Sequence, residues 1–186
     1  MRVIAGSARR LRLVTPEGND TRPTQDRIKE TLFNMIQNQV PGAVFLDLFA
    51  GSGGIGIEAL SRGARKAVFI ENNATAYKCI MQNLKTTHFE EDAMVIKQDV
   101  VLGLRNIREQ EADIIFIDPP YHGELYERTL SQLSEMNYVT ANTMIIVEAA
   151  VDMDFSFTEN YGFEVRRVKE YKTNKHVFLY RKAVEG

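Results

Sequence analysis

The sequence predicts an α/β fold, a mostly parallel sheet with helices on both faces that ends in an antiparallel hairpin. Five short apolar runs alternate with segments of helical spacing between residues 43 and 148, which is typical of parallel strands covered on both faces. After residue 163 the alternation stops, and two strand-like runs follow with only a tight turn between them, which favours antiparallel pairing. This layout differs from the six parallel strands of a dinucleotide dehydrogenase.

The elements are expected in the following order. Residues 2–16 alternate apolar and basic side chains around a glycine-containing turn, as a small hairpin would. A helix is expected within residues 21–40, with Thr24 as its N-cap and Asp26 complementing the dipole in the first turn. The expected strands cover residues 43–49, 66–71, 93–99, 113–118, 143–148, 163–174 and 176–182. The further helices are expected at residues 54–62, 73–86, 100–109 and 124–136.

Length and composition predict one ordinary globular domain. The chain has 186 residues, of which 44% are hydrophobic and 26% are charged. We expect residues 1–22 to form a basic hairpin extension and residues 23–186 to form the core. Cys79 is the single cysteine, so no disulfide framework or zinc site is expected. No apolar run is long enough for a signal peptide or a membrane span, so a cytoplasmic protein is expected. We also expect a monomer that holds no metal.

Charge is distributed unevenly, although the net charge is only -2. Residues 1–29 carry seven Arg or Lys against three acids, and residues 165–182 carry seven against Glu170 alone. The rest of the chain has a net charge of -12. Two basic ends around an acidic middle could direct a polyanion onto one face, although charge runs are also common on solvated strands.

A glycine-rich segment joins the first long strand to its helix and predicts a cofactor site. Gly51, Gly53 and Gly56 match G-x-G-x-x-G, which alone does not separate NAD from S-adenosylmethionine. Asp47, at the end of the strand, suits a cationic amino-acid moiety and would repel a pyrophosphate. Glu71 and Asp99 end the next two strands, where they could accept hydrogen bonds from ribose hydroxyls and from an adenine amino group. The expected cofactor-binding residues are Asp47, Phe49, Ala50, Gly51, Ser52, Gly53, Glu71, Asn72, Asp99, Val100 and Asp118.

The fourth strand of the parallel series ends in Asp118-Pro119-Pro120-Tyr121, the expected catalytic residues. An ionised Asp118 and the carbonyl of Pro119 are both acceptors, so together they can receive both hydrogens of an amino group. Holding those N–H bonds out of the ring plane would free the nitrogen lone pair for attack on a methyl group. Tyr121 offers a ring face on which an extruded base can stack.

The chain resembles the RsmD-type 16S ribosomal RNA guanine-N2 methyltransferases, a family of class I amino-methyltransferases with a D-P-P-Y or N-P-P-Y motif. The resemblance covers nearly the whole chain, and its specific parts are Arg-Pro-Thr at residues 22–24 and the Arg27 to Asn34 helix. It also covers residues 2–6, 49–53, 58–64 and 118–121. Many members have Phe in place of Tyr121, which preserves stacking.

The resemblance implies a seven-stranded Rossmann-like sheet with an N-terminal hairpin, and S-adenosylmethionine as cofactor. It implies a guanine in a small-subunit rRNA loop as substrate, presented in a partly assembled ribosomal subunit. By position, Asp47 and the glycine loop would hold the methionine end, Glu71 the ribose, Asp99 the adenine and Asp118 to Tyr121 the target amine. Arg22, Thr24 and Arg27 would lie near the mouth of the active site.

Basic residues near both ends are the candidates for RNA backbone contacts. These candidates are Arg9, Arg10, Arg12, Arg22, Arg27, Arg166, Arg167, Lys169, Lys172 and Lys175. An exposed rRNA loop needs little unpairing before a base is turned out, and no separate domain for reading duplex DNA is evident.

Three other interpretations remain open at this point. The D-P-P-Y chemistry also suits an N6-adenine methyltransferase acting on DNA or RNA. The glycine pattern suits an NAD-dependent oxidoreductase, which would leave D-P-P-Y unexplained. A non-catalytic RNA-binding module with a degenerate cofactor fold would bind RNA independently of S-adenosylmethionine. The histidines His88, His122 and His176 have no evident triad or metal partner, and Glu148 suits either the rim of the site or an ion pair with the basic tail.

Overall fold

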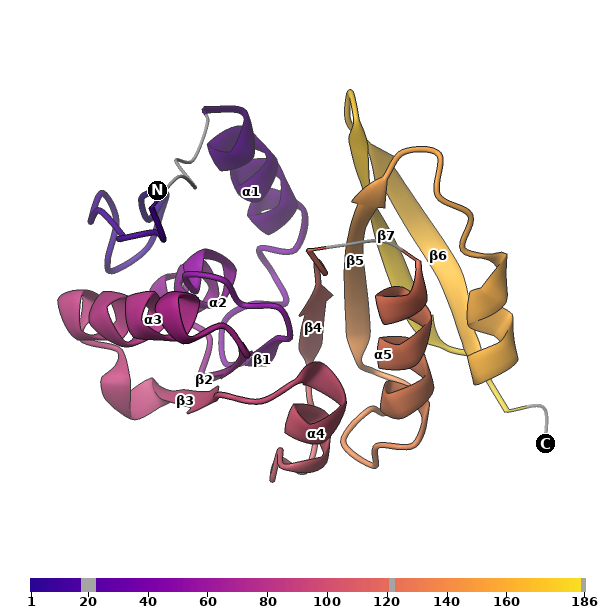
Figure 1. The fold of residues 1–186 in the computed structure, drawn as a ribbon. Helices are drawn as coiled ribbons and strands as arrows, with labels where there is room; N and C mark the ends of the chain where they lie inside the picture. Colours follow the sequence, from indigo (N-terminus) through magenta and orange to yellow (C-terminus); the bar gives the residue numbers. More distant parts are fainter. Residues whose placement is uncertain (18–22, 121–122, 185–186) are drawn as a thin grey trace.

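A seven-stranded sheet in the order β3-β2-β1-β4-β5-β7-β6 forms the centre of the computed structural model, which describes residues 1–17, 23–120 and 123–184. The strands are β1 Val44–Asp47, β2 Lys66–Ile70, β3 Ala93–Ile96, β4 Ile114–Ile117, β5 Met144–Ala150, β6 Phe163–Glu170 and β7 Asn174–Arg181. Strands β1 to β5 pair in parallel, whereas β7 pairs antiparallel with both β5 and β6 (Figure 1). The predicted fold class is confirmed.

Helices cover both faces of this sheet. They are α1 Pro23–Met35, α2 Gly54–Ser61, α3 Ala74–Thr87, α4 Val100–Arg105 and α5 Glu124–Ser134, with 3-10 helices η1 Glu90–Asp92 and η2 Ser156–Tyr161. Helices α1, α2 and α3 pack on one face, and α4 and α5 pack on the other. Within the described ranges, no helix combines the length and apolar character needed to cross a membrane.

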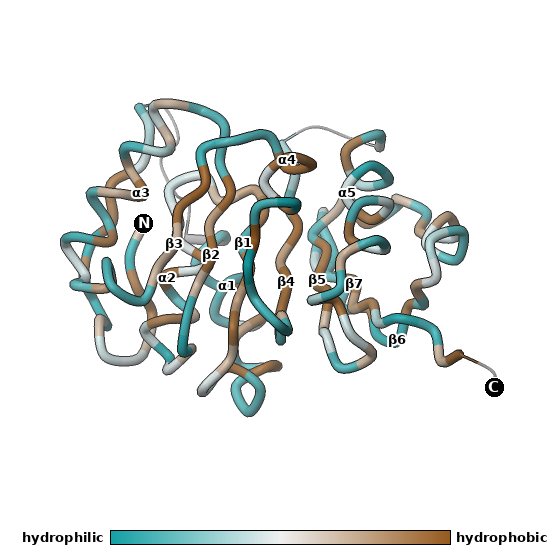
Figure 2. The backbone as a smooth tube through the Cα atoms, turned by 90° about the horizontal axis from the view of Figure 1, so that it is seen from below, coloured by the Kyte–Doolittle hydropathy of each residue, from teal (hydrophilic) through white to brown (hydrophobic). Residues whose placement is uncertain are grey.

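Successive strand residues feed two separate hydrophobic cores. In β1, Val44 and Leu46 belong to the core under α4 and α5, whereas Phe45 belongs to the core under α1 to α3. All three are fully buried, because a strand with helices on both faces needs apolar residues at every position. Figure 2 shows this arrangement as largely brown central strands surrounded by helices with teal stretches.

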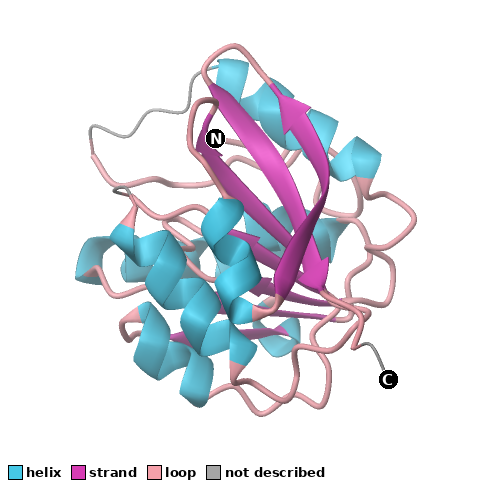
Figure 3. Cartoon of the chain, turned by 90° about the vertical axis from the view of Figure 1, so that its right-hand side faces the viewer, coloured by secondary structure: helices cyan, strands magenta, loops and turns pink. Residues whose placement is uncertain are grey.

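Several element ends differ from the sequence expectation. Helix α1 starts at Pro23, one residue before the expected N-cap Thr24, whose side chain lies outside the described residues. The turn between β6 and β7 covers residues 171–173, and Tyr171 N–H donates to the Asn174 carbonyl at 2.8 Å. Residues 174 and 175 therefore belong to β7. The resulting hairpin extends past the shorter parallel strands (Figure 3).

The N-terminal hairpin takes a reduced form, with one antiparallel bridge between Arg2 and Arg12. The backbone donors of its turn bind α2 instead of extending a strand ladder. Glu58, fully buried in α2, accepts from Ile4 N–H at 2.9 Å and from Ala5 N–H at 3.1 Å. The Ser61 hydroxyl accepts from Ala8 N–H at 2.9 Å. These contacts fix the N-terminal segment against the helix that follows the glycine-rich loop.

Gly56 sets the distance between α2 and the sheet. An added Cβ would lie 2.3 Å from a ring carbon of Phe69, which is fully buried in β2 and cannot move aside. We expect Gly56→Ala to lower the free energy of unfolding by about 1–3 kcal/mol, because this clash exceeds the ~1 kcal/mol gain in helix propensity. A drop in Tm of about 4–8 °C would correspond to ~2 kcal/mol in a chain of this size.

Gly54→Ala is the matched control in the same helix. Its Cβ would meet the sulfur of Met1 at 2.3 Å, which is the far end of a flexible side chain. We therefore expect its Tm to stay within about 2 °C of the wild type, or to rise. Equal destabilisation by both substitutions would show that the contact with Phe69 does not limit this packing.

Candidate active site

A cleft of about 1360 Å³ opens at the carboxyl ends of β1, β2, β4 and β5. Open α/β sheets bind their ligands at this edge, because the loops that follow each strand converge there. The cleft is lined by the carboxylates predicted from the sequence and by two residues left unassigned there. These residues are Asp47, Glu71, Asp99, Asp118, Glu148 and His176.

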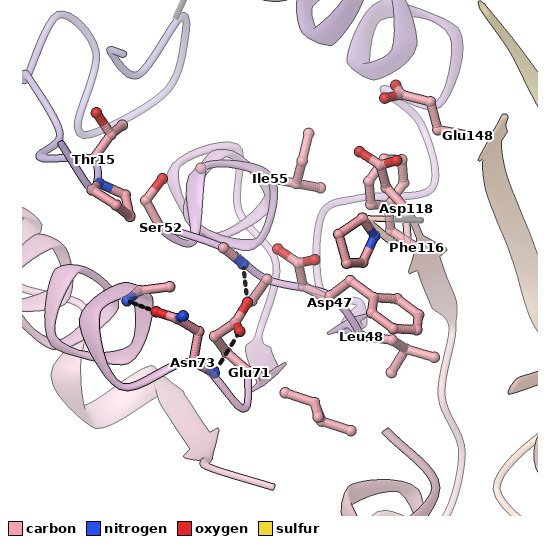
Figure 4. Close-up of a pocket in the computed structure, with 18 of the residues that line it drawn as sticks. Thr15, Asp47, Leu48, Ser52, Ile55, Glu71, Asn73, Phe116, Asp118 and Glu148 are labelled. Atoms are coloured by element: carbon pink, nitrogen blue, oxygen red, sulfur yellow. Dashed lines mark hydrogen bonds between the residues drawn. The ribbon is translucent and has the colours of Figure 1, made fainter. Parts of the chain in front are cut away.

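The glycine-rich loop is held in place by Glu71. The two carboxylate oxygens of Glu71 accept from Gly51 N–H at 2.8 Å and from Asn73 N–H at 2.9 Å (Figure 4). Gly51 has a φ of 57°, and a Cβ there would project into open space. Each carboxylate oxygen can accept more than one hydrogen bond, so Glu71 can hold the loop and still accept from ligand hydroxyls.

Asp47 lies at the floor of the cleft and is 1% exposed. Its Oδ2 accepts from the Gly56 N–H, in the first turn of α2, at 3.1 Å. Burial, with added repulsion from Asp118 and Glu71, raises the pKa of Asp47 to about 7. The negative charge that Asp47 carries when ionised is therefore only partly compensated by the protein.

Asp99 caps α4 as well as lining the cleft. Its Oδ1 accepts from Leu102 N–H at 3.0 Å, and its Oδ2 lies 4.0 Å from the Arg128 guanidinium. The side chain is 45% exposed, so part of it stays accessible from the cleft. The helix-cap role and a ligand-binding role are therefore compatible.

Most of the other predicted cofactor residues line the same cleft. They are Phe49, Ala50, Ser52, Asn72 and Val100. Gly53 instead lies behind the loop, where it precedes α2 with a φ of 87° and its Cα faces Phe69, Ile57 and Ile80. Its contribution is the left-handed turn and not a cleft surface.

The turn after β4 places Asp118 where the sequence predicts it. Asp118 is accessible from the cleft, although protein atoms surround it closely on its other sides. Pro119 is buried behind the turn, and Pro120 lines the cleft. Tyr121 and His122 lie outside the described residues.

Asp118 is joined to a side-chain network that the sequence did not predict. Its carboxyl group lies beside that of Glu148 (Figure 4). Glu148 Oε1 is 2.7 Å from His176 Nε2, and His176 Nδ1 is 2.9 Å from the Tyr171 hydroxyl. Burial and the neighbouring Glu148 raise the pKa of Asp118 well above its usual range, and burial raises the pKa of Glu148.

One sequence signal could have located this network. Glu148 ends a parallel strand, and His176 begins the antiparallel strand that returns beside it, so both lie at the same sheet edge. The β5–β7 register makes Glu148 and His176 direct partners. The pairing of these two strands had to be known first, and strand order was not deduced from the sequence.

The electrostatic character of the cleft favours a cationic ligand. Carboxylates outnumber basic groups among the charged residues of its lining, and the N–H of Gly56 in the first turn of α2 is bonded to Asp47. A pyrophosphate bound as in dinucleotide enzymes needs free N–H groups at such a helix N-terminus. A ligand with an ammonium or sulfonium group would instead relieve the repulsion among Asp47, Glu71 and Asp118.

The predicted RNA-binding residues lie on two sides of the cleft. Arg9, Arg10, Arg12 and Arg27 are exposed on the N-terminal side, and Arg166, Arg167, Lys169 and Lys172 are exposed on the β6–β7 hairpin. Figure 1 shows the N-terminal segment on one side of the molecule and the β6–β7 hairpin on the other, with α1 between them. Arg22 lies outside the described residues.

Lys175 is engaged within the protein. Its Nζ donates to the Met153 carbonyl at 2.7 Å and lies 5.5 Å from the centroid of the Phe155 ring. Because this contact orients the ammonium towards η2, Lys175 is a weaker candidate for an RNA contact than the exposed residues of β6.

Comparisons with known proteins agree with this geometry. The family model described as conserved hypothetical protein 95 matches residues 1–181. The chain is 39% identical over 163 residues to ribosomal RNA small subunit methyltransferase D of Haemophilus influenzae, covering 87% of this chain and 84% of that protein. The solved structure of the Escherichia coli protein yhhF superposes with a TM-score of 0.83 at 31% identity, covering 98% of both chains. A precorrin-6y C5,15-methyltransferase from Geobacter metallireducens shares the fold, with a TM-score of 0.65 at 17% identity over 92% of this chain and 94% of that one.

Proposed function

Because this chain belongs to the family described as conserved hypothetical protein 95 and is a methyltransferase of the Rossmann-like class I fold, we propose that it methylates the N2 amino group of a guanine in small-subunit ribosomal RNA. The methyl donor in this proposal is S-adenosylmethionine. The observation that carries the proposal is the position of Asp118, beside a carboxylate-lined cleft at the carboxyl ends of the parallel strands.

The residues of the cleft fit S-adenosylmethionine. Asp47 would bind the ammonium group, the backbone at Gly51 and Ser52 would border the methionine moiety, and Glu71 would accept from the ribose hydroxyls. Asp99, whose side chain is 45% exposed, would accept from the adenine amino group. The open space at Gly51, which a Cβ would fill, supports this placement.

When bound, S-adenosylmethionine supplies a sulfonium methyl group, to which an amine lone pair can bond while the carbon–sulfur electron pair passes to sulfur. Asp118 orients the amine by accepting one N–H, and the Pro119 carbonyl accepts the other. This arrangement withdraws the lone pair from conjugation with the base and directs it towards the cleft. After transfer, the nitrogen releases one proton to the carboxylate of Asp118 and then to water. In this proposal Tyr121 stacks on the base, with Arg22, Thr24 and Arg27 at the mouth of the site.

We propose that rRNA spans the cleft and contacts basic residues at both ends of the sheet. The acidic cleft would admit the base and the cationic cofactor, while the arginines and lysines outside it bind phosphates. The N-terminal cluster, defined as Arg9, Arg10 and Arg12, is exposed and is anchored to the catalytic domain through Glu58 and Ser61. We retain residues 1–22 as an RNA-binding extension of the core formed by residues 23–186.

Removing the N-terminal cluster should reduce the salt dependence of RNA binding. With all three arginines changed to glutamine, the slope of log K against log salt should become less steep by about 2, because each lost phosphate contact contributes ~0.7. Arg108→Gln is the control, because Arg108 is exposed in the loop that leads into the amino end of β4, whereas the cleft lies at the carboxyl ends of the strands. An unchanged slope in the triple variant would remove this cluster from the RNA interface.

The remaining alternatives make different predictions for one experiment. Small ribosomal subunits from cells lacking the protein, naked rRNA and DNA would each be incubated with the protein and methyl-labelled S-adenosylmethionine. Label in N2-methylguanosine from rRNA supports the proposal, whereas label in N6-methyladenosine favours an adenine methyltransferase. Absence of label, together with RNA binding that S-adenosylmethionine does not affect, would favour a non-catalytic module. Binding of NAD instead of S-adenosylmethionine would favour an oxidoreductase.

A further inference from the structure

The carboxyl group of Glu148 is a second acceptor beside the proposed amine-binding residue. Glu148 lines the cleft with a side chain that is 21% exposed, and its carboxyl group lies next to that of Asp118 (Figure 4). The two residues come from adjacent parallel strands, because β4 pairs with β5 and both end at the cleft. A planar ligand that reaches Asp118 can therefore meet Glu148 with a neighbouring atom.

His176 determines that Glu148 acts as a hydrogen-bond acceptor. Burial lowers the pKa of His176 to about 4, so the ring is neutral and carries one N–H. Burial raises the pKa of Tyr171 to about 12, so its hydroxyl keeps its proton and can donate to Nδ1 at 2.9 Å. Nε2–H then donates to Glu148 Oε1 at 2.7 Å. This chain of donors keeps Glu148 an acceptor and leaves its other oxygen for the cleft.

The two bases that compete for this site differ at the atom beside the amine. In guanine the N2 amino group lies next to N1–H, so two neighbouring positions of the Watson–Crick edge are donors. In adenine the N6 amino group lies next to an unprotonated N1, which is an acceptor. Two adjacent carboxylates match the donor pair of guanine, whereas one of them would face a lone pair in adenine.

We propose that Glu148, positioned by His176, accepts the N1–H of the target guanine while Asp118 accepts from its N2 amino group. Glu148 is then the residue by which the site selects guanine over adenine, an inference that rests on the proposed function. Burial raises the pKa of both Asp118 and Glu148, and two donors from a base would stabilise the ionised carboxylates.

The test compares guanine with 2-aminopurine, which keeps the 2-amino group and lacks N1–H. Small subunits would be reconstituted with rRNA carrying either base at the methylated position, and kcat/KM would be measured for each. We expect the wild type to prefer guanine by about 100-fold, because 2-aminopurine leaves a carboxylate facing a lone pair. In Glu148→Gln, the amide can donate to N1 of 2-aminopurine, so the preference should fall below about tenfold.

Control variants separate base selection from general damage. Glu91→Gln alters an exposed glutamate in η1 and should leave the preference at the wild-type value. His176→Gln keeps a donor for Glu148 and should retain most of the preference, whereas His176→Leu should lose it without a change in cofactor affinity. If Glu148→Gln fails to fold, the preference for guanine over 2-aminopurine is compared between His176→Gln and His176→Leu instead.

The outcomes distinguish this inference from the proposed function. Guanine methylation by the wild type with less than about threefold discrimination against 2-aminopurine would overturn the inference and leave the function intact. A preference that Glu148→Gln and His176→Leu leave unchanged would also overturn it. Absence of guanine methylation by the wild type would instead contradict the proposed function itself.

Discussion

Asp118→Ala is expected to lower kcat for methyl transfer by about 10³-fold. Asp118 lies at the cleft beside Glu148. The sequence places it among both the catalytic and the cofactor-binding candidates, and we propose that its contact is with the amine. Removing its carboxyl leaves the amine without its charged acceptor, so the lone pair stays conjugated with the base. The Kd for S-adenosylmethionine, measured by calorimetry, should change by less than about threefold, which corresponds to ~0.7 kcal/mol.

Asp118→Asn is the matched comparison, because its side-chain carbonyl can still accept an N–H. We expect this variant to retain far more activity than Asp118→Ala, with a loss of about tenfold. A large rise in Kd for S-adenosylmethionine in Asp118→Ala would show that Asp118 belongs to the cofactor site. Equal losses in the two variants would show that the carbonyl acceptor contributes nothing.

Glu71→Ala is expected to weaken binding of S-adenosylmethionine and S-adenosylhomocysteine by about 100-fold or more. Glu71 holds the loop through Gly51 N–H and Asn73 N–H and is proposed to accept from the ribose as well. Hydrogen bonds to a charged group contribute about 1.5–3 kcal/mol each, so losing two corresponds to about 100-fold or more. Calorimetric titration with both ligands measures the change directly.

Two further variants define the origin of that loss. Glu71→Gln retains one carbonyl acceptor and should lose about tenfold in affinity. Glu91→Ala removes an exposed carboxylate from η1 and should leave affinity unchanged. If Glu71→Ala bound both ligands as tightly as the wild type, the assignment of Glu71 to the ribose would be wrong.

The fold class could be predicted because every central strand is buried on both faces. Runs such as residues 44–46 and 114–117 are apolar at each position, and this pattern survives any error at the element ends. The ends were less well predicted, since turns such as residues 171–173 depend on local hydrogen bonds. The reduced N-terminal hairpin could not be foreseen, because its donors bind Glu58 and Ser61, more than 50 residues away in sequence.

The candidate site was predicted where motif and strand end coincide. Asp47, Glu71, Asp99 and Asp118 each follow a parallel strand, and the sheet brings such positions to one edge. Their ligand roles stay predictions. Glu148 and His176 were left unassigned, because their contact depends on the antiparallel pairing of β5 with β7. Arg166 to Lys172 and the N-terminal cluster could not be placed relative to each other without the strand order.

The most direct test of the central claim is nucleoside analysis of small-subunit rRNA from cells that lack this protein. The RNA would be compared after complementation with the wild type and with Asp118→Ala, produced at equal levels. We predict that N2-methylguanosine at one rRNA position is absent without the protein, returns with the wild type and stays absent with Asp118→Ala. Unchanged N2-methylguanosine in all three samples would contradict the proposed reaction.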